Sequence, residues 1–128
     1  MLNKNITLKI WERDIDLEVE FDCFDGEEIT SIQKETYDEF MKEYKNIFNS
    51  AYPMIKEYCM TNFSSLVTDN FDNIYRYVKP KQLYIKRSVT NNRVAGVLCN
   101  FRLDMEHGLA IYIENGQVKE IGSQDIIL

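Results

Sequence analysis

The stretch Asp14-Ile15-Asp16-Leu17-Glu18-Val19-Glu20-Phe21-Asp22 decides the fold at the N-terminal end, because apolar and acidic residues alternate along it without a break. Such a period of two places the apolar side chains on one face of a β-strand and the acidic ones on the other. The preceding segment repeats the alternation, with Ile6, Leu8 and Ile10 separated by polar residues. With a polar turn at residues 12–14 between them, the two segments predict a β-hairpin.

A long amphipathic segment follows the polar loop at residues 22–28. Its apolar residues recur at steps of three and four from Ile32 to Phe63, which is typical of one face of a helix. Pro53 lies inside this stripe, and it lacks the N–H that a helix interior requires. We therefore expect two helical pieces, at about residues 30–49 and 52–62.

Cap-type residues at positions 69–73 predict a further, short helix that ends before Pro80. Alternation then indicates a strand, with Leu83, Ile85, Arg87 and Val89 on one face. Asn tolerates positive φ, so Asn91-Asn92 predicts a two-residue hairpin turn after this strand.

Three more strands complete the chain. Residues 94–103 carry apolar side chains on both faces, which predicts a central strand. Residues 109–114 and 117–121 flank Asn115-Gly116, a strong signal for a β-hairpin. Strands grouped apart from helices indicate an α+β fold with an N-terminal β-hairpin, a helical block and a C-terminal four-strand antiparallel meander. We expect residues 1–128 to form a single domain.

Composition narrows the functional classes. Fifteen basic and 21 acidic residues give a formal net charge of −6, which disfavours nucleic acid and anionic membranes as partners. The cysteines at positions 23, 59 and 99 are odd in number and widely spaced, as free thiols in a reducing compartment are. We see no signal peptide and no apolar run of about 18 residues, so we expect a cytoplasmic protein. The sequence also has no Gly-rich phosphate loop, so we expect no cofactor.

The acidic row, defined as Asp14, Asp16, Glu18, Glu20 and Asp22, is the first candidate site. Neighbouring carboxylates about 7 Å apart repel by only about 0.6 kcal/mol per pair in water, so a strand tolerates the row if solvent or cations face it. It is either a plain solvated face or a docking surface for a basic protein. A metal site is disfavoured, because an extended strand splays its carboxylates too far apart to surround one ion.

Catalytic and metal chemistry find little support elsewhere in the sequence. The loop at residues 22–28 is acidic but lacks the alternating ligands of a calcium loop. His107 is the only histidine, whereas zinc sites usually use several His or Cys ligands. A nucleophilic pair would require Cys99 and His107 to meet across the end of a strand. We therefore assign no catalytic residue and no metal ligand.

The segment from Phe101 to Ile111, with Asp104-Met105-Glu106-His107-Gly108 at its centre, carries a resemblance to a known family. Together with Asn115-Gly116 and Ile121-Gly122, it resembles a family of small uncharacterised bacterial domains with an Asp-x-Glu-His-Gly segment. Some of those domains are immunity-like proteins of toxin systems. The resemblance marks Asp104, Glu106, His107 and Gly108, here called the signature turn, without assigning them a role.

Two functional hypotheses follow. The first is a non-catalytic immunity protein that neutralises a cognate bacterial toxin, whose basic surface the acidic row would attract. The second is a general interaction or scaffold domain that self-associates as a homodimer. A small enzyme centred on His107 is a third, weaker alternative.

Overall fold

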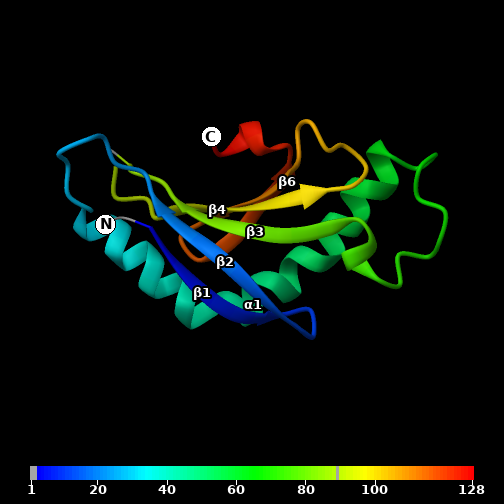
Figure 1. The fold of residues 1–128 in the computed structure, drawn as a ribbon, viewed down its shortest axis with the longest axis horizontal. Coiled ribbons are helices and arrows are strands. Elements are labelled where there is room, and N and C mark those ends of the chain that lie inside the picture. Colours follow the sequence, from blue (N-terminus) through cyan, green and yellow to red (C-terminus); the bar gives the residue numbers. More distant parts are fainter. Residues whose placement is uncertain (1–2, 89) are drawn as a thin grey trace.

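The computed structural model describes residues 3–88 and 90–128, which form one six-stranded sheet and one long helix (Figure 1). The sheet has the strand order β1-β2-β3-β4-β5-β6, and every neighbouring pair is antiparallel except β2 and β3, which are parallel. The elements are β1 (Asn3–Ile10), β2 (Arg13–Phe21), α1 (Ser31–Asn62), η1 (Ile74–Arg76), β3 (Val78–Ile85), β4 (Val94–Phe101), β5 (Leu109–Glu114), β6 (Gln117–Gly122) and η2 (Gln124–Ile126).

Helix α1 covers one face of this sheet and encloses the main core with it. The inward residues of β2 and the apolar stripe of α1 are buried together. Polar side chains fix the helix at two points along its length: Gln33 donates to the carbonyl of Asp22, and Trp11 donates from Nε1 to the carbonyl of Phe48, both at 2.9 Å. Neither α1 nor any other helix of the described residues is long and apolar enough to cross a membrane.

The expected break of the helix at Pro53 was wrong, since α1 runs without interruption from one end to the other. Pro53 is exposed, whereas Ala51 and Ile55 on the opposite side are fully buried. The carbonyl that Pro53 leaves without a donor therefore faces water. Large apolar side chains gain about 1.5–3 kcal/mol each from burial, and several of them together outweigh the roughly 3 kcal/mol cost of an internal proline.

The expected short helix before Pro80 was also wrong, because only the single 3₁₀ turn η1 forms there. The side chain of Asp69 accepts a hydrogen bond from the amide of Phe71, and Asn73 accepts one from Tyr75. These cap-type residues thus stabilise turns rather than a helix start. Strand β3 begins immediately afterwards, at Val78, so no residues remain to extend the turn.

The predicted N-terminal hairpin is confirmed, and so is the antiparallel order of the last four strands, with the turn at Asn115-Gly116. The first strand of the meander was misplaced: β3 ends at Ile85, and Val89 lies outside the described residues. The start of β3 at Val78 was not predicted, because a proline is unusual inside a strand. A β-bulge between Pro80 and Gln82 accommodates the proline. Residues 86–93 join β3 to β4, in place of the expected two-residue turn at Asn91-Asn92.

The parallel pairing of β2 with β3 was not expected. It joins the N-terminal hairpin to the meander in one mixed sheet, and α1 is the crossover that a parallel pair requires.

The other face of the sheet, which points away from α1, is divided into two halves. On β4 and β5 it is apolar, and the C-terminal turn (residues 123–128) covers it, with Ile127 packed against Val94, Leu98 and Ala110. Figure 1 shows this turn, in red, beside β4 and away from β1 and β2. The same face of β1, β2 and β3 carries polar residues, and we call it the open face.

Gly96 tests how closely the C-terminal turn packs. A Cβ added at Gly96 would lie 2.7 Å from Cγ1 of the fully buried Ile127. Gly96→Ala should therefore lower the free energy of unfolding by about 1–3 kcal/mol, measured by urea denaturation. Ile127→Ala alone should cost about 2–5 kcal/mol. The double variant should lose clearly less than the sum, because truncation of Ile127 relieves the clash; strict additivity would contradict this packing.

Candidate protein-binding face

The acidic row lies on the open face. Strand β2 turns Ile15, Leu17, Val19 and Phe21 toward α1, so the intervening carboxylates point to the other side. Asp14, Asp16 and Glu18 are exposed, Glu20 is half-buried, and Asp22 follows the strand directly. Among the described residues no member of the row forms an ion pair. The structure thus places all five carboxylates in one line, next to solvent.

Neighbouring strands contribute hydrogen-bonding side chains to the open face. Thr7 on β1 donates to Asp16 at 2.6 Å, and Gln82 on β3 donates to Glu20 at 3.1 Å. These bonds hold two of the five carboxylates in place, while Asp14 and Glu18 accept no side-chain hydrogen bond among the described residues. A partner with basic side chains would therefore find two carboxylates held in place, Asp16 and Glu20, beside two that accept no side-chain hydrogen bond, Asp14 and Glu18.

Glu20 and Asp22, at the C-terminal end of the acidic row, affect the pKa of Tyr84. Tyr84 stands opposite Glu20 in the parallel register. Burial contributes most to raising the pKa of Tyr84 to about 12, and the negative charges of Asp22 and Glu20 add to it. Tyr84 also packs against the cluster around Ile127, and so marks the boundary between the open face and the covered half.

The signature turn lies elsewhere, in the connection from β4 to β5. Nδ1 of His107 is 3.0 Å from a carboxylate oxygen of Asp104, and this hydrogen bond is the main cause that lowers the pKa of Asp104 and raises that of His107. Gly108 adopts a φ of +66°, a conformation that favours glycine. A Cβ there would also lie 2.5 Å from Nε2 of Gln124.

The signature turn holds the C-terminal turn against the sheet. The amide of Gln124 donates to the carbonyl of His107 at 3.0 Å, and its side chain donates to the carbonyl of Cys99 at 3.2 Å. Glu106 is exposed. The signature positions therefore act on the fold, by closing the β4–β5 connection and supporting the segment that carries Ile127.

The structure does not bring Cys99 and His107 together as a reactive pair. Cys99 points into the core beneath α1 and is fully buried, and burial raises the pKa of its thiol. The imidazole of His107 is more than half exposed and faces Asp104. In the part of the chain that the structure describes, no three His, Cys, Asp or Glu side chains are placed to hold a metal ion.

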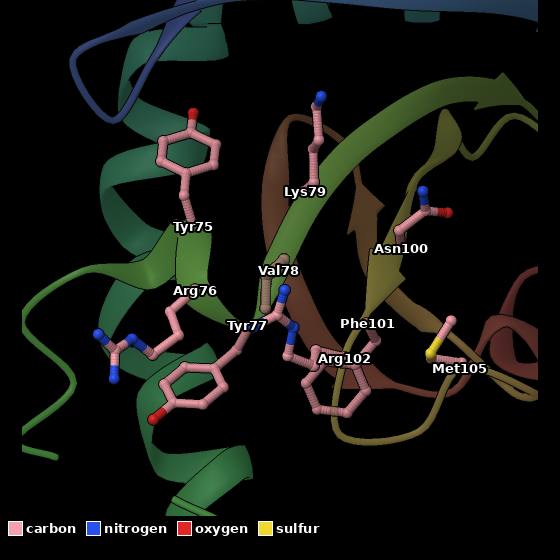
Figure 2. A pocket seen from close by; sticks show the side chains of 9 residues that line it. All are labelled: Tyr75, Arg76, Tyr77, Val78, Lys79, Asn100, Phe101, Arg102 and Met105. Carbon is pink, nitrogen blue, oxygen red and sulfur yellow. The ribbon is translucent and has the colours of Figure 1, made fainter. Parts of the chain in front are cut away.

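One group of candidate functional residues, a cluster of basic side chains, was not predicted from the sequence. Arg76, Lys79 and Arg102 line a pocket of about 460 Å³ at the beginning of β3 and the end of β4 (Figure 2). These residues are spread over 26 positions of the chain and come from different elements, so the sequence contains no run of basic residues that would indicate the cluster. Only the antiparallel pairing of β3 with β4 brings them to one place.

In the comparison with protein families, a family model described as "Domain of unknown function (DUF6985)" matches residues 2–128. The match extends over nearly the whole chain, not only over the C-terminal third that carries the signature turn. No curated protein and no solved structure matches the chain. Because the family description names no activity, the roles of the residues above rest on their geometry.

The pair of Asp104 and His107 predicts a specific pH dependence. His107 should titrate above the ordinary value of 6.5, and Asp104→Asn should move its midpoint back toward 6.5. Glu106→Gln, a weaker influence on His107, should move it less. Since the chain has one histidine, its C2 proton gives a single NMR signal that reports this directly.

The same pair contributes to stability over a limited pH range. The raised pKa of His107 gives a contribution that is full below 6.5 and is lost as the pH rises through the folded value. The lowered pKa of Asp104 gives one that is present above 3.8 and is lost as the pH falls. The Tm difference between the wild type and His107→Gln should therefore be largest between these two values. A constant difference from pH 4 to pH 8 would contradict the assignment.

Proposed function

We propose a function for this chain, which belongs to the DUF6985 family of domains of unknown function: it is a non-catalytic domain that binds a basic protein through the open face. The observation that carries this proposal is the contrast between the two halves of one sheet face. The chain covers the half on β4 and β5 with its own C-terminal turn, and leaves the half on β1, β2 and β3 uncovered.

The chemistry of the open face favours a partner with positive charge. Five carboxylates in a line, without ion-pair partners among the described residues, attract Lys and Arg side chains and accelerate their approach. Pairing restrains strand β2, on the β1 side from Arg13 to Glu20 and on the β3 side from Glu18 to Phe21. Such a row loses little conformational entropy when a partner binds, which favours affinity.

The same charges argue against self-association through this face. Two copies placed row against row would bring ten carboxylates together, more than Lys9 and Lys79 on the same face can neutralise, and like charges facing each other across an interface cost several kcal/mol. The scaffold alternative therefore requires a different surface, such as the free edge of β1.

We further propose that the basic partner is a cognate bacterial toxin, which this chain neutralises. The support is the resemblance of residues 101–111 to immunity-like proteins, together with the acidic row. Toxins that cut nucleic acid must carry positive charge where they hold phosphates, and an acidic domain can occupy that same surface. In this mechanism the chain acts by covering the toxin, without chemistry of its own.

Charge reversal tests the proposal. The variant Asp16→Lys/Glu18→Lys should bind the basic partner roughly 100-fold more weakly than the wild type. The matched control Asp38→Lys/Glu57→Lys changes the net charge equally on exposed positions of α1, and should bind as the wild type does. The partner is first isolated by affinity purification, with the tagged chain as bait, from the cells in which the chain is naturally produced. Its binding to each variant is then measured by calorimetry, and the affinity of the complex should fall with added salt.

Neutralisation of a toxin is tested separately, by measuring cell growth. If the retained protein arrests growth when produced alone, co-production of the wild type or the control should restore growth, and the Asp16→Lys/Glu18→Lys variant should not. Equal protection by both variants would exclude the acidic row from the interface. A homodimer that buries the row, seen by sedimentation of the chain alone, would favour the scaffold function instead.

A further inference from the structure

A second site of opposite charge lies near the acidic row. The cationic pocket, of about 460 Å³, is lined by Arg76, Lys79 and Arg102 together with Asn100 and aromatic side chains, and none of the described residues that line it is a carboxylate. In a chain with a net charge of −6, a pocket with three positive side chains and no negative one departs from the composition of the whole.

The sheet register explains how these side chains meet. Lys79 on β3 stands directly opposite Asn100 on β4, so the two point to the same side of the sheet from adjacent strands. The amide of Arg102 donates to the carbonyl of Tyr77 at 2.8 Å, which fixes the backbone of Arg102 beside the start of β3. Lys79 and Asn100 therefore stand on the sheet itself, and Arg102 is tied to the sheet by its backbone.

Two of the three cations are available for a ligand. Arg76 lies 3.4 Å from Asp69, and Figure 2 shows it directed away from Lys79. Lys79 and Arg102 form no ion pair among the described residues, and both are exposed. In Figure 2, Arg102 lies beside Val78 at the start of β3, while Lys79 and Asn100 extend away from it, so the long, exposed side chains of Lys79 and Arg102 have to turn toward each other to hold one anion.

Of the carboxylates near these residues in sequence, Asp69 and Asp104 are already engaged, and the exposed Asp72 and Glu106 are not among the residues that line the pocket. Asp69 accepts hydrogen bonds from Phe71 and Tyr77, and Asp104 is held by His107. On the far side of Tyr75, Arg13 lies 4.6 Å from the centre of the tyrosine ring and adds a further positive charge at the rim. Among the described residues, the lining thus holds two cations, Lys79 and Arg102, that are not paired with a carboxylate.

We propose that the cationic pocket binds the phosphate group of a small organic phosphate. A phosphate monoester carries a charge of about −1.5 to −2 at neutral pH, which matches two free cations, whereas a single carboxylate leaves one of them unneutralised. The fork of Arg102 and the ammonium of Lys79 are both good phosphate donors, and the amide of Asn100 supplies a third. The volume lies within the range of small-molecule sites.

The remaining lining suits the organic part of the ligand. The half-buried Tyr75 supplies aromatic surface, and the thioether of the exposed Met105 closes the opposite side, whereas the ring of Tyr77 is buried in the core. The hydroxyl of Tyr75 donates to the carbonyl of Ile10, so its ring is held in place. The phosphate therefore binds at Arg102, Lys79 and Asn100, and the ester group rests on Tyr75. This site uses no carboxylate of the acidic row, although Lys79 stands on the β3 part of the open face.

The test uses phenyl phosphate, inorganic phosphate and benzoate, each titrated into the full chain and followed by ¹H–¹⁵N NMR. Phenyl phosphate should bind with saturation and shift the amide signals of residues 77–79 and 100–102. Inorganic phosphate should bind more weakly, because it lacks the apolar group, and benzoate should bind weakest. Arg102→Gln and Lys79→Gln should each weaken phenyl phosphate binding about tenfold, while the exposed Lys119→Gln serves as the unchanged control.

Three results would overturn the proposal. One is a set of shifts that does not saturate or that falls outside residues 77–79 and 100–102. Another is binding of benzoate as tight as that of phenyl phosphate, which would remove the preference for a dianion. The third is undiminished binding by Arg102→Gln and Lys79→Gln, whose exposed positions allow both variants to fold.

Discussion

A single helix can bury only one face of a sheet, and this constraint governs the rest of the molecule. The 32 residues of α1 extend about 48 Å, enough to follow the sheet along its length, but they leave its second face without a helix. The chain answers in two ways. Where the second face is apolar, on β4 and β5, the C-terminal turn covers it with Ile127; where it remains uncovered, on β1 to β3, it is charged and hydrated. Both candidate surfaces follow from this division.

The two surfaces have opposite charges and depend on different parts of the fold. The acidic row comes from one strand, so its geometry is the simple alternation of a β-strand. The cationic pocket is assembled from η1, β3 and the residue after β4, and exists only because β3 pairs with β4. The signature turn lies just beyond the pocket and holds the C-terminal turn through Gln124. The open face and the half covered by the C-terminal turn thus adjoin on one side of the sheet, with Tyr84 at the border between them.

These differences explain what could be predicted from the sequence. Local periodicity identified the hairpin, the helical segment and the turn at Asn115-Gly116, because each depends on residues close in the chain. The continuity of α1 at Pro53 could not be predicted, since it depends on tertiary packing of Ile55 and its neighbours. The parallel pairing of β2 with β3 and the cationic pocket were missed because both join residues whose proximity only the folded sheet creates. The acidic row, being local, was found where the structure has it.

The open face as a docking surface is the central claim, and labelling of carboxyl groups tests it most directly. Carbodiimide labelling followed by mass spectrometry would compare the free chain with the chain bound to its basic partner. The account predicts that Asp14, Asp16 and Glu18 lose most of their labelling in the complex, while Asp38 and Glu57 on the exposed side of α1 keep theirs. Unchanged labelling of the acidic row in a saturated complex would contradict it.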